Sequence, residues 1–194
     1  MKHAVIVAHP DRDSFTLTMA RAYCEAAEAK GDEPILRDLY RMGFDPRLGA
    51  GEIPRPGGFA PAQDVRAERE VVGDAAIFAF FYPLWFNAPP AILKGYLDRI
   101  FTMGFGYGPV QGGGNQPLLG GRRMISFSSS GAPHEWLEDT GAWTAIRTLD
   151  GHLARVCGLG VVDHLHFGGI VPGIVPEAVE RCAGEVRRTV VERL

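Results

Sequence analysis

Cysteine is scarce in this sequence, and that scarcity excludes two kinds of scaffold. Only Cys24, Cys157 and Cys182 occur among 194 residues, far apart and without a C-x-x-C pair. An odd number of isolated thiols does not build a disulfide framework or a zinc ribbon. A chain of this length needs neither, because it buries roughly 70% of its unfolded surface. We therefore expect one domain spanning residues 1–194, with buried or inert thiols.

Long apolar runs and a surplus of one charge are also missing. The early apolar run from Ala4 to Ala8 is too short for the core of a signal peptide, and no segment approaches the ~20 apolar residues of a membrane span. The 20 basic and 23 acidic residues give a net charge of −3 without a block of either sign. The sequence thus predicts a cytoplasmic protein that binds a small molecule, without membrane insertion or a nucleic-acid partner.

Three catalytic signatures are absent as well. The turn after the first predicted strand lacks the G-x-G-x-x-G of a dinucleotide-binding fold, and no G-x-S-x-G nucleophile elbow occurs. His134-Glu135 has no second histidine at the spacing of a zinc hydrolase, and His164 and His166 lie in a predicted strand without further ligands. These histidines are expected to be structural, and the sequence predicts no metal site.

The segment from Phe78 to Phe101 carries the strongest positive signal. Its apolar run ends at Pro83, and a helix opens on Pro89-Pro90, where the first N–H groups have no partner in any case. Continuous apolarity is typical of a strand covered on both faces, as in a parallel sheet. Residues 84–87 then lie in the turn outside the carboxyl end of a central strand, where open α/β sheets bind ligands. Aromatic rings and free backbone amides in this turn suit a flat ring with polar edges, such as a flavin.

Strand and helix signals alternate along the rest of the chain. Strands are predicted at residues 1–8, 33–38, 75–81, 123–127 and 161–167, and helices at 15–30, 63–72, 90–103, 143–156 and 176–193. Ser14 is the expected N-cap of the first helix, and Gly31 is expected at its C-terminal end. This alternation predicts an α/β fold, a doubly wound five-stranded parallel sheet in the flavodoxin-like order 2-1-3-4-5.

Two further turns at the same sheet edge offer polar groups. His9 follows the first predicted strand, and Ser14 and Thr16 stand at a helix start, where free N–H groups and the helix dipole favour a phosphate. Ser128 to Gly131 follow the fourth strand with small hydroxyl side chains. Because the carboxyl ends of parallel strands share one edge, the three turns are expected to meet in one pocket. The alternatives are a histidine bonded within its own turn and a serine-rich turn without a ligand.

Two loops, residues 41–61 and 104–121, are longer than compact domains usually contain, and both are candidates for covering the pocket. The second is rich in glycine, at Gly104, Gly106, Gly108, Gly112, Gly113, Gly114, Gly120 and Gly121. It is expected either to move as a lid or to form a flexible hairpin insertion.

Apolar side chains gather beside the second loop, at Tyr96, Ile100, Phe101, Phe105 and Tyr107. They exceed what one small domain needs to bury, and exposed apolar patches mark interfaces. The sequence therefore predicts a homodimer.

Together, these motifs resemble the flavodoxin-like NAD(P)H:quinone oxidoreductases. The residues that carry the resemblance are His9-Pro10, Ser14-Phe15, Asp38-Leu39-Tyr40, Phe44-Asp45-Pro46, Pro83-Leu84-Trp85-Phe86, Pro90 to Gly95, Asp98 to Phe101 and Gly104 to Tyr107. The similarity runs from Met1 to about Phe167. It implies a dimer that binds one flavin per subunit near the interface, reduces it with NAD(P)H and passes a hydride to a quinone.

The resemblance also implies roles by position. The residues expected to hold the flavin phosphates are His9, Ser14, Phe15 and Thr16. Those expected to line the isoalloxazine ring are Pro83, Leu84, Trp85, Phe86, Asn87, Ser128, Ser129, Ser130 and Gly131. Tyr107 matches a tyrosine that reaches the neighbouring subunit's flavin pocket, and it is the expected catalytic residue. Asp38-Leu39-Tyr40 and the loop after it favour FAD as the cofactor, with FMN as the alternative.

The chain departs from mammalian members of this family in two places. They carry a histidine before a glycine where this chain has Thr140-Gly141, so their tyrosine–histidine charge relay does not carry over whole, and they extend well past the position of Leu194. The shorter form resembles bacterial members, some of which are ancillary subunits of potassium efflux systems. We expect an NAD(P)H dehydrogenase of quinones or similar flat electrophiles that works by ping-pong hydride transfer. A regulatory or electron-carrier flavoprotein is the alternative.

Overall fold

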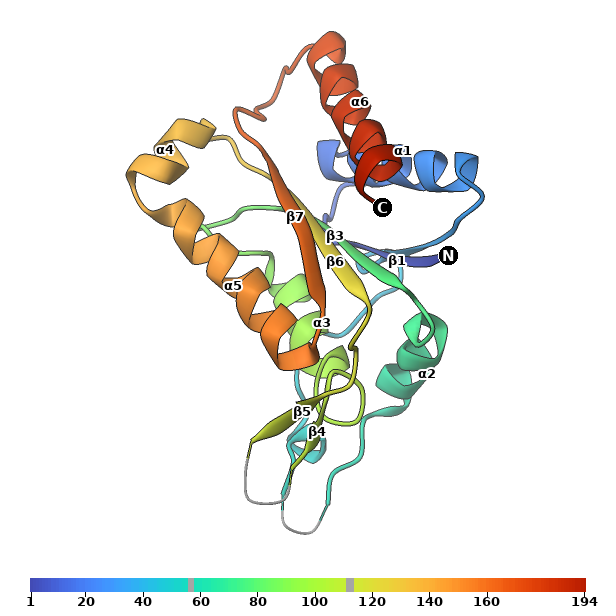
Figure 1. Ribbon diagram of the computed structural model, residues 1–194. Coiled ribbons are helices and arrows are strands. Elements are labelled where there is room, and N and C mark those ends of the chain that lie inside the picture. Colours follow the sequence, from blue (N-terminus) through green and yellow to red (C-terminus); the bar gives the residue numbers. More distant parts are fainter. Residues whose placement is uncertain (56–57, 111–113) are drawn as a thin grey trace.

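The computed structural model describes residues 1–55, 58–110 and 114–194. Its centre is a parallel five-stranded sheet in the order β2-β1-β3-β6-β7 (Figure 1). The strands are β1 (Lys2–Val7), β2 (Glu33–Asp38), β3 (Ile77–Pro83), β6 (Arg123–Ser129) and β7 (Gly160–Phe167). In order of appearance these strands are arranged 2-1-3-4-5, so the predicted flavodoxin-like fold is confirmed.

Helices cover both faces of the sheet (Figure 1). α1 (Phe15–Ala29) and α6 (Pro176–Arg193) pack on one face. α2 (Gln63–Val72), α3 (Ala91–Ile100) and α5 (Ala142–Cys157) pack on the other. The sequence did not predict the short helices η1 (Ala50–Glu52) and α4 (His134–Asp139), or the individual strands β4 (Tyr107–Pro109) and β5 (Asn115–Pro117). The predicted cap of α1 is present, because Ser14 Oγ accepts the Leu17 N–H at 3.2 Å.

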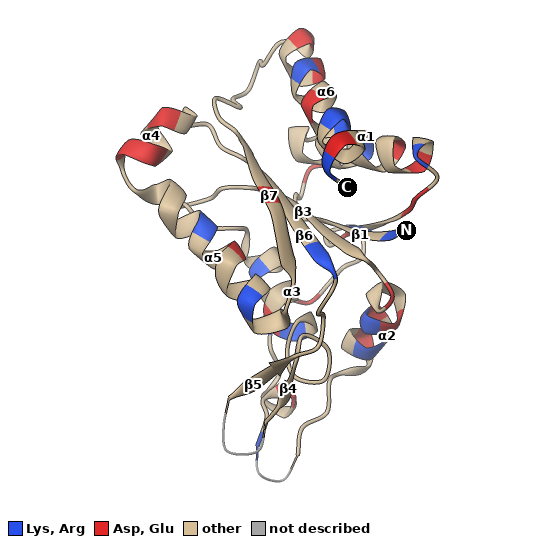
Figure 2. Ribbon diagram, in the orientation of Figure 1, with Lys and Arg blue, Asp and Glu red and all other residues tan. Residues whose placement is uncertain are grey.

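The central strand β3 is buried at every position, as its continuous apolarity predicts. On the α1 side, the Phe81 ring stacks on Phe127 with 4.5 Å between centroids. On the α3 side, Phe78 meets Phe101 edge to face. Charged residues lie mostly on the helices (Figure 2), which leaves the sheet as the apolar centre. Within the described residues, no helix combines the length and apolarity needed to cross a bilayer.

β3 and β6 both run beyond their predicted ends. Tyr82 pairs with Ser128 and Pro83 with Ser129, so the two serines belong to a strand and not to a turn. Side chains in a strand alternate between faces. Ser129 therefore faces the α1 side, whereas Ser128 faces the α5 side, where it contacts His164. The prediction that both serines line one pocket overlooked this alternation.

The long loop at residues 41–61 packs against α3. The Arg99 guanidinium donates to the Glu52 carboxylate at 3.2 Å and to the Asp64 carboxylate at 2.7 Å. Gly95 lets the loop approach closely, since a Cβ there would lie 2.3 Å from the Pro46 carbonyl oxygen. Residues 56 and 57 lie outside the described part. The rest of this loop does not line the cleft described below, so it is not a lid over it.

The glycine-rich segment 104–121 contains the antiparallel β4–β5 hairpin at the amino-terminal edge of the sheet (Figure 1). The predicted pocket belongs to the opposite edge. Gly112 and Gly113 lie outside the described residues, and the remaining residues of the segment do not reach their own chain's cleft. The structure therefore agrees with the hairpin alternative and not with a lid over the chain's own pocket.

The apolar cluster that predicted a dimer lies largely inside the protomer. Tyr96 and Ile100 are fully buried, and Phe101 is 3% exposed. Phe44, from the long loop, packs against Tyr96 with 5.2 Å between ring centroids. These side chains serve the core of the chain, so the argument that they form an exposed interface is wrong.

Candidate functional site

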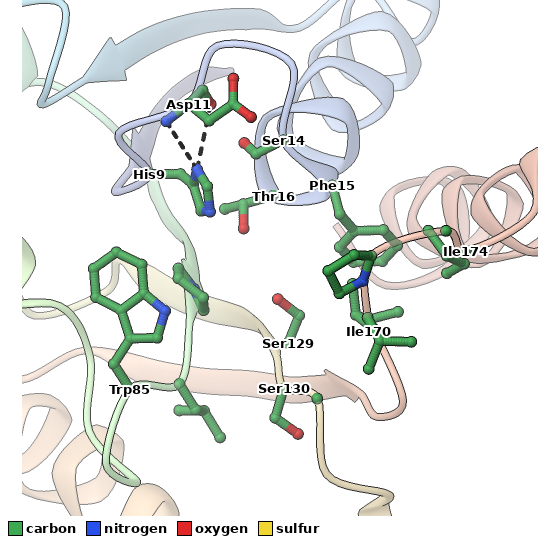
Figure 3. Close-up of a pocket in the computed structure, with 16 residues that line it drawn as sticks. His9, Asp11, Ser14, Phe15, Thr16, Trp85, Ser129, Ser130, Ile170 and Ile174 are labelled. Atoms are coloured by element: carbon green, nitrogen blue, oxygen red, sulfur yellow. Dashed lines mark hydrogen bonds between the residues drawn. The ribbon is translucent and has the colours of Figure 1, made fainter.

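A cleft of about 350 Å³ opens at the carboxyl ends of β1, β3 and β6 (Figure 3). The predicted residues that line it are His9, Ser14, Phe15, Thr16, Pro83, Leu84, Trp85, Ser129, Ser130 and Gly131. Asp11 and residues 170–174 complete the lining. The three turns that the sequence predicted to converge do meet here.

One end of the cleft is the start of α1. Ser14 Oγ accepts the Leu17 N–H, and the Ser14 carbonyl accepts the Thr18 N–H at 3.0 Å. The N–H groups of Phe15 and Thr16 then have no acceptor within the described residues, as expected for a first helical turn. These donors, the adjacent Thr16 hydroxyl and the helix dipole together favour a bound anion.

His9 adds a donor to the same end. The Asp11 N–H donates to His9 Nδ1 at 3.1 Å, so a neutral ring carries its proton on Nε2. Figure 3 shows the free ring nitrogen directed into the cleft. Arg41 fixes the turn from outside, because it donates to the His9 carbonyl at 2.8 Å and to Asp38 at 3.0 Å. The predicted alternative, a histidine hydrogen-bonded within its own turn, therefore also holds. One ring nitrogen makes that bond, and the other is available to a ligand in the cleft.

The opposite wall is the turn after β3. Trp85 and Ala88 exchange two backbone hydrogen bonds, at 3.0 and 3.1 Å, around Phe86 and Asn87. Both central residues have positive φ, 50° for Phe86 and 55° for Asn87, which is the geometry of a tight hairpin turn. A phenylalanine in this region costs about 1–3 kcal/mol. The turn directs Trp85 toward the cleft beside His9, and leaves Phe86 fully exposed.

Some predicted site residues lie outside the cleft. Phe86 and Asn87 do not line it, and Ser128 faces the other side of the sheet. The backbone N–H groups of Leu84 and Trp85 were expected to be free, but they donate to the carbonyl oxygens of Ser129 and Ala88. Tyr107 begins β4 at the far edge, half-buried, with its hydroxyl 3.4 Å from Thr102 Oγ1. Tyr107 therefore does not contact the cleft of its own chain.

Residues 170–174 form a wall that the sequence analysis missed. Figure 3 shows Ile170 and Ile174 across the cleft from Trp85. The Ile170 N–H donates to the Ser130 carbonyl at 2.9 Å, which fixes this segment against the serine turn. Gly168 and Gly169, directly after the last predicted strand, were the available signal, because paired glycines there mark a turn at the same sheet edge.

A row of hydrogen-bonded polar side chains lies behind the serine turn, on the α5 side of the sheet. His164 Nδ1 is 2.6 Å from Asp150 Oδ2, and its Nε2 is 2.7 Å from Ser128 Oγ. Ser128 Oγ is also 2.8 Å from His166 Nδ1, and His166 Nε2 is 2.9 Å from Ser130 Oγ. The row thus runs from a buried carboxylate to the wall of the cleft.

A register shift between β6 and β7 creates this row. Met124 pairs with Val161, but Ile125 pairs with Asp163, so one residue of β7 is skipped. Beyond the shift, Ser126 stands opposite His164 and Ser128 opposite His166. Paired residues of neighbouring strands point to the same face, and bulges of this kind re-aim side chains. The shift therefore turns both histidines toward the serines.

Ser128, His164 and Asp150 have the connectivity of a serine-hydrolase triad, but not its accessibility. Ser128 is 1% exposed, and its oxygen already contacts both histidine rings. A nucleophile must reach a carbonyl beside an oxyanion hole. The geometry argues against acyl transfer, in agreement with the missing nucleophile elbow.

Thiol and metal chemistry are also disfavoured. Burial raises the pKa of the Cys157 thiol to about 11, and burial with two neighbouring glutamates raises that of Cys24 to about 12, so both stay protonated at neutral pH. Among the described residues, no three histidine, cysteine or acidic side chains converge in a way that could hold a metal ion.

Comparisons with known proteins agree with the fold. The family model described as flavodoxin-like fold matches residues 1–190. A protein of Haemophilus influenzae named as an uncharacterized NAD(P)H oxidoreductase is 31% identical over 172 residues, 88% of this chain and 85% of that protein. The structure of the NAD(P)H:quinone oxidoreductase from Methanothermobacter marburgensis superposes with a TM-score of 0.86 at 31% identity, covering 99% of this chain and 98% of that one. The chain belongs to the flavodoxin-like fold family, and the resemblance found in the sequence is confirmed.

Two further comparisons show how far the similarity extends. NAD(P)H dehydrogenase [quinone] 1 of Cavia porcellus is 32% identical over 145 residues, which cover 66% of this chain but 53% of that protein. The chain thus matches about half the length of this mammalian relative. An FMN-dependent NADH-azoreductase from Bacillus anthracis, solved with FMN, shares the fold with a TM-score of 0.71 at 18% identity, over 98% of this chain and 97% of that one.

Proposed function

We propose that this member of the flavodoxin-like fold family is a flavin-dependent NAD(P)H oxidoreductase that reduces quinones or similar flat electrophiles. The observation that carries the proposal is the chemistry of the cleft, with the N–H donors of Phe15 and Thr16 at one end and the Trp85 wall at the other. An anion site beside an aromatic wall matches a cofactor that joins a phosphate to a flat ring. The names of the Haemophilus and Methanothermobacter relatives support the same activity.

The residues present fit a flavin. Its phosphate would be held by the first N–H groups of α1, the Thr16 hydroxyl and the His9 Nε2–H. Its ring would lie along Leu84 and Trp85, with polar edges toward the Ser130–Gly131 turn. When bound, the flavin accepts a hydride from NAD(P)H and passes it to the acceptor. We propose FAD as the cofactor, with FMN as the alternative.

The chain itself contributes placement and electrostatics. Fixed polar groups of the serine turn would stabilise negative charge at the ring edge, because preorganised dipoles act strongly where water is excluded. Asp11, the acidic residue of the lining, is engaged elsewhere, since its Oδ1 accepts the Asp13 N–H at 3.0 Å. Its negative charge is therefore partly compensated within its own turn.

The proposal includes a homodimer. Three large rings near the carboxyl edge are exposed to solvent, Trp85 by 44%, Phe86 by 106% and Trp136 by 49%. Exposed apolar surface of this kind marks an interface. Because Tyr107 lies at the opposite sheet edge from its own cleft, we propose that it acts at the cleft of the second copy. Light scattering at micromolar concentration tests the assembly, and a monomer would contradict it.

The test of the flavoprotein assignment is a visible spectrum of the purified protein. We expect a yellow protein that bleaches with NADH or NADPH and recovers its colour when menadione is added. Chromatography of the released cofactor then distinguishes FAD from FMN. A colourless protein that takes up neither flavin would end the proposal, and a yellow protein that neither pyridine nucleotide reduces would favour the electron-carrier alternative.

Kinetics test whether donor and acceptor share the cleft. If both bind at the same ring face in turn, initial-rate plots at several NAD(P)H concentrations give parallel lines. Intersecting lines would show that both bind at once and would rule out the ping-pong order.

A further inference from the structure

The proposed function does not use the row of polar side chains behind the serine turn. Contacts of 2.6 to 2.9 Å join five residues end to end, in the order Asp150, His164, Ser128, His166 and Ser130. Ser128 is 1% exposed and Asp150 is 7% exposed. Of the five, only Ser130 lines the cleft within the described residues. The row therefore has one end on the proposed active site. Ser128, His164 and Asp150 are buried, and His166 is half-buried.

The four contacts within the row are all satisfied in a first arrangement of protons. His164 donates from Nδ1 to the Asp150 carboxylate, and Ser128 donates to His164 Nε2. His166 donates from Nδ1 to Ser128, and Ser130 donates to His166 Nε2. Both rings are neutral, and each contact joins one donor to one acceptor.

A second arrangement contains one more proton. A proton from the cleft binds Ser130 Oγ while the original Ser130 proton moves to His166 Nε2. His166 then passes its Nδ1 proton to Ser128, and Ser128 passes its own to His164 Nε2. Ser130 now donates to the Ala132 carbonyl, 2.8 Å away, and the charged His164 ring lies beside the Asp150 carboxylate. Each N–H or O–H bond that breaks is matched by one that forms, and no electrons are transferred.

We propose that these five residues form a store for one proton, which the cleft fills and empties through Ser130. This inference rests on the proposed function, because NAD(P)H supplies a hydride, two electrons and one proton, whereas a quinone needs two electrons and two protons. The balanced reaction is NAD(P)H + H⁺ + quinone → NAD(P)⁺ + hydroquinone. The store fills while the cleft is open to water. It empties in the reverse order when an acceptor covers the cleft.

The surroundings assign the stored charge to His164 and not to His166. Burial, followed by the nearby His134 and His164, lowers the pKa of His166 to about 4, so that ring is neutral near neutral pH. His164 instead has the Asp150 carboxylate as a counter-charge, and Ser126 donates to the same carboxylate at 3.2 Å. The row therefore has a neutral histidine, His166, toward the cleft end and a histidine paired with a carboxylate, His164, at the buried end.

Other groups around His164 come from β3, α4, α5 and β7. Tyr82 and Trp143 meet its ring at 6.1 and 4.9 Å between centroids, and the Trp143 ring also contacts His134. A hollow of about 280 Å³ is lined by His164 and Asp150 together with Arg147 and Asp163. Asp163 accepts the His164 backbone N–H at 2.8 Å and pairs with Arg193, which partly neutralises its charge.

A matched pair of variants separates the row from its surroundings. Ser128→Ala removes the hydroxyl that joins the two histidines. Ser126→Ala is the control, because Ser126 lies on the same strand and face and is also 1% exposed, but contacts Asp150 as a side branch. Ser128→Thr restores a hydroxyl in the middle of the row and tests for rescue.

The first measurement is the proton position on each ring, by long-range ¹H–¹⁵N NMR of the purified protein between pH 5 and 9. We expect His166 to move its proton from Nδ1 to Nε2 together with the gain of a second ring proton by His164. Ser126→Ala should keep this coupling, and Ser128→Ala should lose it. The store is overturned if the two rings do not change their protons together.

The second measurement is proton uptake, followed with an indicator dye as reduced protein reacts once with menadione. Ser128→Ala should slow proton uptake and reoxidation by roughly 100-fold, the lower end of the range for a lost proton-transfer group. Ser126→Ala should react at nearly the rate of the unaltered protein, and Ser128→Thr should recover that rate. All three variants should keep their flavin. Equal rates in Ser128→Ala and Ser126→Ala would overturn the store. Failure of the proposed function would give a different result. The unaltered protein would then lack flavin, or its flavin would not bleach with NADH or NADPH. The coupling between the two histidine rings would still be measurable by NMR.

Discussion

Two clusters of polar groups, each with a buried part, lie on the α2, α3 and α5 side of this sheet, and they are built from different residues. The first cluster, which we call the clasp, ties α2, α3 and the 41–61 loop together. Its members are Arg37, Glu68, Tyr96, Arg99, Glu52 and Asp64. The second cluster, which we call the proton row, leads to the cleft. Its members are Asp150, His164, Ser128, His166 and Ser130. The first uses arginine and the second uses histidine.

This difference decides what each cluster does. Arginine is always charged and only donates, so the bonds of Arg99 to Glu52 and Asp64 have one fixed direction. Histidine and serine both donate and accept, so the direction of every bond from His164 to Ser130 is reversible. A cluster that only stabilises needs the first property. A cluster that moves a proton needs the second.

The largest expected effect concerns the clasp. Arg99→Ala leaves Glu52, which is 6% exposed, as an unpaired buried charge. We expect a loss of about 3–5 kcal/mol in the free energy of unfolding, measured by urea denaturation. Arg47→Ala is the control, because Arg47 pairs with Asp45 at the surface and its loss should leave the midpoint unchanged. Equal losses in both variants would show that burial of the clasp does not matter for stability.

The second prediction concerns pH and the proton row. His166 takes up a proton near pH 6.5 when unfolded but only near pH 4 when folded, because burial lowers its pKa. Between these values the unfolded state binds more protons, so the free energy of unfolding should fall as the pH falls from about 6.5 to about 4 and then level off. The Arg99 guanidinium lowers the pKa of Asp64 from 3.8, so the contribution of Asp64 is lost only at more acidic pH.

His166→Gln tests this pH dependence. Burial lowers the pKa of His3 as well, which adds a slope of the same sign in both proteins. The relevant quantity is therefore the difference between the unaltered protein and the variant. If the two pH profiles run parallel between pH 4 and 6.5, His166 does not contribute, and the contrast between row and clasp weakens.

The third prediction separates the cleft from both clusters. Thr16→Val removes a hydroxyl at the start of α1 while keeping the side-chain shape, and should weaken flavin binding about 10-fold, or ~1.4 kcal/mol. Thr18→Val is the matched control, since its hydroxyl donates to the Ser14 carbonyl at 3.1 Å, within the first turn of the helix. Titration of the apoprotein with flavin measures both. Similar losses in the two variants would mean that helix stability, and not phosphate binding, is affected.

The smallest expected effect concerns Tyr107, at the edge opposite the cleft. Tyr107→Phe should keep the flavin and its reduction by NAD(P)H, and lower kcat/KM for the quinone by at most about 10-fold, or ~1.4 kcal/mol, if the hydroxyl contacts the acceptor in the second copy. Thr102→Val removes the hydroxyl that lies 3.4 Å from Tyr107 and controls for loss of that contact. An unchanged quinone rate would make Tyr107 a packing residue.

Local patterns in the chain were sufficient for the architecture and for most of the cleft. The apolar run of β3, the alternation of strands and helices and the Ser14 cap are short-range features, and each appears in the structure as predicted. The convergence of the three turns followed from one topological rule, that carboxyl ends of parallel strands share an edge. Ten of the predicted residues line the cleft for that reason.

Contacts between distant segments decided the rest. Ser128 and Ser129 are adjacent in sequence, yet pairing with Tyr82 and Pro83 assigns them to opposite faces. The skipped residue in β7 turns His164 and His166 toward the serines, and no local signal marks that skip. The close approach of Pro46 to Gly95 holds a long loop against α3. Burial, register and the direction of a side chain depend on which segments meet, and residues far apart in the sequence determine this together.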